Sequence, residues 1–159
     1  MKHFISICCF LKASILVYGQ TENIDRFEFK YTCEKNQSDT SLIYVDAVIM
    51  NNTMEKVYFL SESCNGLDYY LTTNSPMLET YRMIRCNATF PRKIEIDPNS
   101  GYAFNVILKK KTNVQNVILT LTLVELTSTT KVDGRYIDEI KIERVNQTIK
   151  INGPIIKMK

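Results

Sequence analysis

The sequence predicts an all-β domain that folds as an antiparallel β-sandwich of eight to ten strands. Short runs in which apolar and polar residues alternate recur along the chain, whereas no segment beyond residue 19 shows sustained helical periodicity. The length of 159 residues, with 45% hydrophobic and 23% charged residues, is ordinary for one folded domain. Because neither an internal repeat nor a linker-like stretch follows residue 19, we expect a single domain over residues 20–159.

The first half of the chain contains the strongest strand patterns. Residues 27–33 alternate between apolar and polar side chains, and residues 42–50 are nearly continuously apolar, as in a central strand. The turn at residues 51–53 leads into the apolar residues 57–60, so we expect 42–50 and 57–60 to form a hairpin. Further strands are expected at residues 67–72, at 78–85 (with a short helix over 77–86 as the alternative), and at 94–96 and 102–108 around a turn at 97–101.

The second half contains the clearest alternation, at residues 117–123, where four large apolar residues share one face. A polar loop is expected from residue 127 to 134. The isoleucines at 140 and 142 mirror those at 149 and 151, which predicts a hairpin over residues 139–151. The tail, residues 154–159, is expected to add an edge strand whose lysines discourage sheet aggregation.

The first 19 residues read as a removable export signal, with Lys2 ahead of an apolar stretch at residues 4–17 and small residues before a cut after Gly19. An uncleaved anchor is the alternative, although the stretch is shorter than the ~20 residues that a span needs. Cleavage would leave a chain that starts at Gln20, is secreted or periplasmic, and has no stable membrane span. Its formal charge would be +1 rather than +3, because two lysines and no acid are removed.

The only histidine, His3, lies in this signal. Without an imidazole, the usual serine and cysteine hydrolase mechanisms are excluded. The cysteines of the mature chain lack the paired spacing of zinc sites, and its few glycines form no phosphate-binding loop. We therefore expect no cofactor, no metal and no nucleic acid partner.

Three cysteines, Cys33, Cys64 and Cys86, remain after the signal. In an oxidising compartment one disulfide and one leftover thiol are the simplest arrangement. Three pairings are open. Cys64 with Cys86 is preferred because both lie at predicted strand ends, and three reduced thiols are the alternative.

Four Asn-x-Ser/Thr triplets, which begin at Asn36, Asn51, Asn87 and Asn146, are read as surface turns.

Three groups of residues are candidates for function. Acidic residues near the C-terminal hairpin suggest a two-carboxylate hydrolase, although tryptophan, which commonly stacks on sugars, is absent. These are Asp133, Asp138, Glu139 and Glu143. Basic residues at 82–111 suggest a patch for an anionic partner. These are Arg82, Arg85, Arg92, Lys93, Lys109, Lys110 and Lys111. Tyrosines 58, 69, 70 and 81 suggest a binding groove.

Residues 42–126 resemble the immunoglobulin-like β-sandwich of the bacterial intracellular proteinase-inhibitor family. The likeness rests on the apolar strand that ends in Asn51-Asn52-Thr53, on Val57-Tyr58-Phe59, and on Ile94-x-Ile96-Asp97-Pro98 before Tyr102 and Phe104. The resemblance implies an immunoglobulin-like fold. It assigns no inhibitory residue, and the export signal and the residues after 135 depart from that family.

Together these patterns predict a non-catalytic exported binding module. Its partner is expected to be a protein or a surface polymer, bound through the loops that hold Cys33, Cys64 and Cys86 or through an open sheet edge. Inhibition of an exported protease or hydrolase is the second hypothesis, and a small carboxylate-dependent hydrolase is the third.

Overall fold

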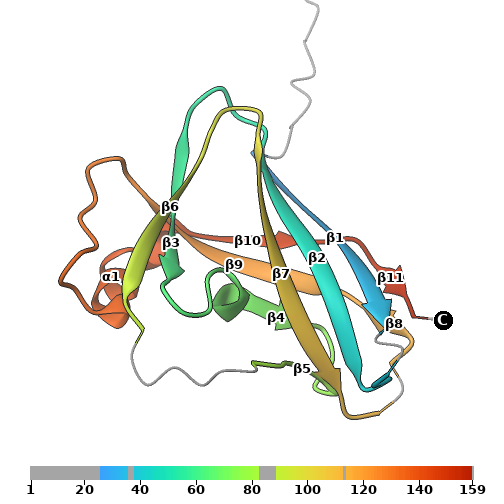
Figure 1. Ribbon diagram of the computed structural model, residues 1–159. Coiled ribbons are helices and arrows are strands. Elements are labelled where there is room, and N and C mark those ends of the chain that lie inside the picture. The colour runs from blue at the N-terminus through green and yellow to red at the C-terminus, as the bar shows by residue number, and fades with distance from the viewer. Residues whose placement is uncertain (1–25, 36–37, 83–88, 113, 159) are drawn as a thin grey trace, which may run out of the picture.

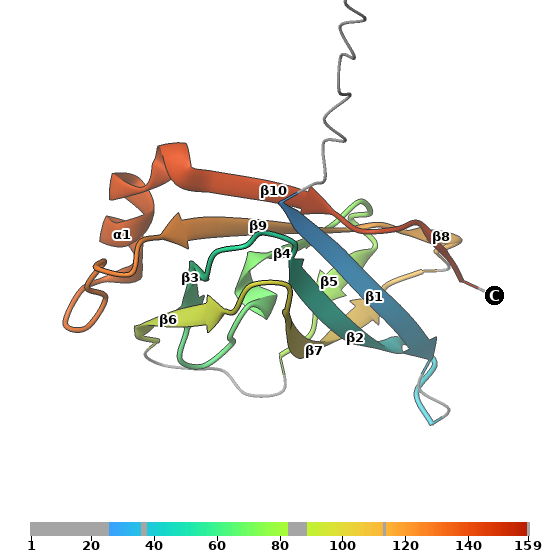
Figure 2. The same cartoon turned by 90° about the horizontal axis from the view of Figure 1, so that it is seen from above.

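The computed structural model describes residues 26–35, 38–82, 89–112 and 114–158, and it confirms the all-β antiparallel sandwich (Figures 1 and 2). The first sheet has the order β1-β2-β7-β5, with β1 (Phe27–Lys35), β2 (Leu42–Asn51), β7 (Gly101–Lys110) and β5 (Leu78–Thr80). The second has the order β10-β9-β3-β6, with β10 (Thr148–Asn152), β9 (Leu119–Leu126), β3 (Val57–Glu62) and β6 (Pro91–Ile96).

One shorter strand extends the second sheet, and two others form a separate two-stranded sheet. β4 (Leu71–Thr73) also pairs with β9, and β11 (Ile156–Lys157) pairs with β8 (Asn116–Val117), which confirms the edge strand expected in the tail. The described residues thus contain eleven strands. This exceeds the expected eight to ten because four of them are only two or three residues long.

Among the described strands the chain passes between the two sheets five times, and two of these crossings lie next to each other. β2 belongs to the first sheet and β3 to the second, while β6 and β7 make the return crossing. The expected hairpin of residues 42–50 with 57–60 is therefore wrong. β2 pairs with β1 on one side and with β7 on the other, so it has no free edge for β3.

The predicted inward faces form the core. In β2 the side chains of Ile43, Val45, Ala47 and Ile49 are buried, and in β8 and β9 the same holds for Val117, Leu119, Leu121 and Leu123. Phe27 of β1 packs edge-on against Phe59 of β3, with ring centroids 5.3 Å apart, which joins the two sheets. Strand alternation alone was sufficient to find these faces.

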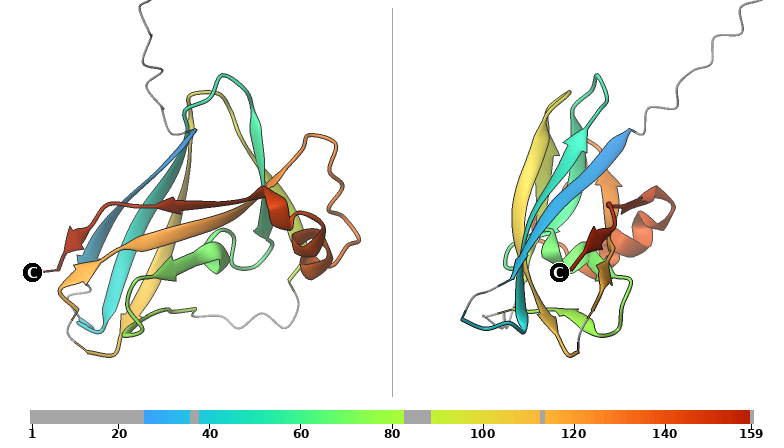
Figure 3. Two further views of the ribbon diagram at one scale, coloured as in Figure 1. Left: turned by 180° about the vertical axis from the view of Figure 1, so that it is seen from behind. Right: turned by 90° about the vertical axis from the view of Figure 1, so that its right-hand side faces the viewer.

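The side of the sandwich between β1 and β10 is closed by Tyr31. Its hydroxyl accepts a hydrogen bond from the Leu119 amide at 3.0 Å and lies against the carbonyls of Val117 and Pro154. At Gly153 an added Cβ would lie 2.2 Å from the Tyr31 ring, so the absence of a side chain there allows the close approach. Figure 3 shows β10 passing beside β1 at this side.

The hairpin expected over residues 139–151 is wrong in its first half. Helix α1 (Ile137–Glu143) and the short 3-10 helix η2 (Val145–Gln147) precede β10, and β10 pairs with β9. Ile137 and Ile140, three residues apart on one helical face, are buried. The Glu139 carboxylate accepts a hydrogen bond from the Tyr136 amide, which satisfies a donor at the start of the helix.

Among the described residues no helix has the length and apolar character to cross a membrane.

Two other expected strands are shorter than predicted. The 3-10 helix η1 (Asp68–Tyr70) replaces the start of the strand expected at 67–72, and only β4 remains of it. The strand expected at 78–85 ends with β5, and residues 83–85 lie outside the described residues.

The β2–β3 and β6–β7 crossings are held together by Asn51, the last residue of β2, which is fully buried. Its side-chain nitrogen donates to the carbonyls of Glu55, Ile96 and Asp97 at 2.8, 3.1 and 3.0 Å. Its side-chain oxygen accepts from the amide and the hydroxyl of Thr53 at 3.0 and 2.7 Å. One amide group therefore fixes both the β2–β3 and the β6–β7 connections. The expectation that the triplet at Asn51 marks a surface turn is wrong.

We predict that Asn51→Ala lowers the free energy of unfolding by about 3 kcal/mol, because several buried carbonyl and amide groups lose their partner. Urea unfolding followed by circular dichroism measures the change. Asn116→Ala, at an exposed asparagine in β8, is the matched control and should change stability by less than about 0.5 kcal/mol. Equal losses in the two variants would contradict this role of Asn51.

Candidate functional site

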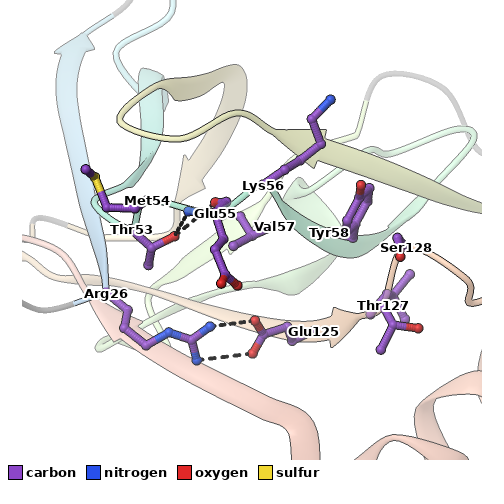
Figure 4. Close-up of a pocket in the computed structure, with 11 residues that line it drawn as sticks. Arg26, Thr53, Met54, Glu55, Lys56, Val57, Tyr58, Glu125, Thr127 and Ser128 are labelled. Carbon is purple, nitrogen blue, oxygen red and sulfur yellow. Dashed lines mark hydrogen bonds and ion pairs between the residues drawn. The ribbon is translucent and has the colours of Figure 1, made fainter.

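A groove of about 520 Å³ lies at the end of the sandwich where β2 crosses to β3 (Figure 4). It is bounded by residues 53–58 on one side and by residues 125–128 at the end of β9 on the other, with Arg26 beside them. β3 and β9 are paired only at Tyr58–Leu126 and Phe59–Glu125. The groove therefore lies where the loops of both sheets come together.

An ion pair joins Arg26 to Glu125 along one wall of the groove. The guanidinium donates to the two carboxylate oxygens at 2.8 and 3.4 Å, and it lies 4.9 Å from the centre of the Phe27 ring. Both groups are partly exposed, so the pair contributes little to stability. The two hydrogen bonds of this pair fix the orientation of the two side chains relative to each other.

A second hollow of about 440 Å³ adjoins the first, and Ser128 lines both. It is formed by Lys93 of β6 and residues 128–133. The Lys93 ammonium donates to the carbonyls of Ser128 and Thr130 at 2.7 and 3.2 Å and lies 5.3 Å from the centre of the Tyr58 ring. These contacts tie the loop after β9 to the edge strand β6.

The connection between β9 and β10, residues 127–147, forms the outer part of this end of the molecule. While Ile137 and Ile140 anchor α1, the side chains of Tyr136, Ile142 and Val145 are 78%, 76% and 64% exposed. The connection is also braced internally. Arg135 donates to the Glu143 carboxylate at 2.7 Å and Arg144 donates to the Thr130 hydroxyl at 3.2 Å.

The four acidic residues considered for hydrolysis all lie in this connection and are exposed. Only Asp133 lines either hollow. The Arg135 guanidinium lowers the pKa of Glu143 below its usual value, so this carboxylate is held ionised. Asp138 and Glu139 occupy the first turn of α1. Within the described ranges no group of three or more His, Cys, Asp or Glu residues could hold a metal ion.

The basic residues proposed as one patch are divided between the two sheets. Arg92 and Lys93 belong to β6, whereas Lys109 and Lys110 end β7 and Lys111 follows. Several have local partners. Lys111 pairs with Glu79 at 2.8 Å, Arg82 lies 3.8 Å from Asp68, and Lys109 lies over the Tyr81 ring. Arg85 lies outside the described residues.

The tyrosines are likewise separated. Tyr58 lines the first groove, and Tyr81 lies beside Lys109. Tyr69 and Tyr70 form an edge-on pair with ring centroids 5.4 Å apart, in the connection between β3 and β4.

Of the asparagines in the glycosylation triplets, Asn146 is exposed, and Asn36 and Asn87 lie outside the described residues.

The cysteines are in different states. Cys33 is a half-buried free thiol in β1, and Cys64 is disulfide-bonded. Cys86 lies outside the described residues, so the pairing of Cys64 with Cys86 stays a prediction. Burial raises the pKa of the Cys33 thiol to about 11.

No protein-family model matches the chain, and no curated protein matches it. Among solved structures, the chain is similar to the crystal structure of a FixG-related protein from Vibrio parahaemolyticus. The TM-score is 0.40 at 11% sequence identity, over 86% of this chain and 99% of that one. The resemblance to the proteinase-inhibitor family stays a prediction.

We predict that Cys33 reacts with iodoacetamide at pH 8 about 100-fold more slowly in the folded protein than in urea, because a pKa near 11 leaves little thiolate at that pH. The rate should rise with pH up to about 11. Mass spectrometry of the alkylated peptide measures both rates. A native rate within about threefold of the rate in urea would show that the thiol is not protected.

Proposed function

We propose that the protein is an exported, non-catalytic binding module that contacts a protein partner through the end of the sandwich that carries the groove and residues 127–147. The observation that carries this proposal is the length of that connection. Neighbouring antiparallel strands are usually joined by about 2–5 residues, and far longer loops in compact domains are commonly functional. Here the connection includes helix α1 and extends well beyond the sheet edge (Figure 1).

The exposed side chains on this connection support a protein partner. Ile142 lies in α1 and Val145 begins η2, and both are more than half exposed. Water contact with such side chains is unfavourable, and clustered exposed apolar residues are typical of interaction surfaces. The buried Ile137 and Ile140 hold the segment in place, so little ordering entropy is lost on binding.

The groove supplies the polar part of this surface. Glu125 and Arg26 present fixed charges of opposite sign, and Thr127 and Ser128 present hydroxyl groups beside them (Figure 4). An apolar centre with a polar rim is the usual composition of a protein interface. Inhibition of an exported hydrolase would be one use of the same surface, and it is separated from simple binding by measuring the turnover of the partner.

Export is supported by the N-terminal pattern and by Cys64, which is disulfide-bonded. Disulfides persist in oxidising compartments and are rare in the cytosol. The proposal therefore places the working chain outside the cytosol, with its N-terminus at Gln20.

We predict that Ile142→Asp and Val145→Asp each weaken capture of the partner at least about tenfold, because a charge at a buried interface position costs about 1.4 kcal/mol or more. The residues 20–159 serve as bait for native extracts, with quantitative mass spectrometry of retained proteins. Ile155→Asp is the matched control, since Ile155 is equally exposed but lies next to β11, far from α1 (Figure 1).

A protein retained by the unchanged chain and by Ile155→Asp, but lost with both α1-region variants, supports the proposal. Retention by all three variants would place the contact elsewhere, and failure to retain any protein would refute a stable protein partner. If the retained protein is a hydrolase, stoichiometric loss of its turnover would make the module an inhibitor.

We predict that the protein isolated from its native source begins at Gln20 and that non-reducing peptide mapping finds Cys64 linked to Cys86. N-terminal sequencing and mass spectrometry measure these two features. A chain that retains residues 1–19, or a reduced Cys86 beside an intact Cys64 disulfide, would contradict the export signal or the pairing, respectively.

A further inference from the structure

The first sheet has an outer face that carries apolar side chains. In β2 the residues that alternate with the buried ones point away from the core, and their register partners in β7 point the same way. Tyr44 pairs with Ile107, and Val48 pairs with Ala103. Tyr44 and Ala103 are exposed, while Val48 and Ile107 are half-buried. In the right-hand view of Figure 3, β1, β2 and β7 form one side of the molecule and α1 lies on the other. The outer face is thus separate from the surface proposed to bind a partner.

Two side chains close this face at the end of β2. A Cβ at Gly101 would lie 2.7 Å from the Met50 sulfur and 2.9 Å from a methyl carbon of Val48. Met50 and Val48 therefore fill the space above the glycine, and the apolar area continues across both strands. A contiguous exposed apolar area is typical of an interaction surface.

A polar pair lies at the centre of the outer face. Asp46 and Asn105 are paired in register and exposed, and the Asn105 side-chain nitrogen donates a hydrogen bond to the Asp46 carboxylate. An asparagine amide carries two N–H groups, and a carboxylate accepts up to about four hydrogen bonds. Within the described part of the chain neither side chain makes another hydrogen bond, so an N–H and several acceptor sites remain. A second copy of the same pair offers the matching acceptor and donor.

A two-fold axis determines which residues meet when two copies pack face to face. If the axis runs parallel to the strands, between β2 and β7, it places β2 of one copy over β7 of the other. Each β2 residue then lies over the β7 residue with which it pairs in its own sheet, so Asp46 meets the second copy's Asn105. An axis at right angles to the strands through this level would instead place Asp46 over the second copy's Asp46. Because like charges at an interface repel each other, the parallel axis is favoured.

Charges near the margins agree with the parallel axis, which also places β1 over the second copy's β5. Glu34 of β1 is exposed on the outer face, paired with Tyr44, and it has no ion-pair partner among the described residues. Lys109 of β7 is exposed on the same face, paired with Glu79 of β5. The axis brings Glu34 of each copy about one strand and two residues from Lys109 of the other, which long side chains can bridge.

Ion pairs within each copy form the rim of the outer face. Glu28 pairs with Lys30 at 2.9 Å on β1, and Glu79 pairs with Lys111 at 2.8 Å beside β5. These pairs keep their contact with water when the centre of the face is covered. An apolar centre with a polar rim is the usual composition of a protein interface.

The outer face is large enough for a weak dimer. β2 and β7 have ten residues each, so the face is about 30 Å long, and four strands about 4.8 Å apart make it about 15–20 Å wide. Two copies would together bury on the order of 1,000 Å², which is near the lower limit for a specific interface. We propose that two copies of this chain associate through the outer face of the first sheet, about a two-fold axis parallel to its strands. The dissociation constant is expected on the order of 10⁻⁵ M.

Sedimentation velocity of residues 20–159 over about 1–500 µM measures this equilibrium. Ala103→Glu and Tyr44→Glu should each weaken dimerisation at least about tenfold, because a charge replaces an apolar contact at the centre of the interface. Both positions are exposed, so the unfolding temperature should change by less than about 2 °C. Ile142→Asp, at an exposed residue of α1 on the other side of the molecule, is the control and should dimerise like the unchanged chain.

A charge swap tests the direction of the axis. Glu34→Lys and Lys109→Glu should each weaken dimerisation about threefold or more, because like charges then face each other, and the double variant should regain the lost affinity. A chain that stays monomeric over the whole concentration range, or a dimer that survives both Ala103→Glu and Tyr44→Glu, would overturn the proposal. A double variant that dimerises no better than the single ones would overturn the two-fold arrangement.

Discussion

The arrangement of both sheets depends on the buried amide of Asn51. An antiparallel sandwich requires the chain to leave one sheet and enter the other, and at each crossing several backbone groups lose their ladder partners. Here the β2–β3 and β6–β7 crossings lie side by side, and a single side chain donates to carbonyls of both. Backbone bonds from Asn51 to Ser100 and from Asn99 to Thr53 join the same two segments. Asparagine is suited to this position because it carries a donor group and an acceptor on one short side chain.

A rigid crossing explains why the candidate binding surface lies where it does. The groove uses residues 53–58, which follow directly after Asn51, and the end of β9, which pairs with the start of β3. Loops that bind partners are most effective when a fixed scaffold positions them. The long connection from β9 to β10 extends from this same end and is tied to β6 by Lys93. The groove, the second hollow and the start of the β9–β10 connection therefore lie next to one another on the β-sandwich.

The sequence predicted the strands whose faces alternate clearly, including β1, β2 and β9, because burial of one face imposes a period of two. It did not predict that β2 and β3 lie in different sheets, since a turn signal such as Asn51-Asn52-Thr53 describes local backbone only. Helix α1 was missed because its two buried isoleucines, Ile137 and Ile140, are too few to establish a helical period. The pair of Arg26 and Glu125 joins residues 99 positions apart, a contact that local patterns do not reveal.

Helix α1 is exposed to solvent at one residue and contacts η1 through the residue next to it. Ile142 is exposed to solvent, whereas the ammonium of the neighbouring Lys141 lies 4.1 Å from the centre of the Tyr69 ring and 5.2 Å from that of Tyr70. These rings belong to η1. A cation–π contact of this kind is stronger when the ring is held still, because less entropy is lost in forming it. The contacts of Lys141 with both rings therefore tie α1 to η1.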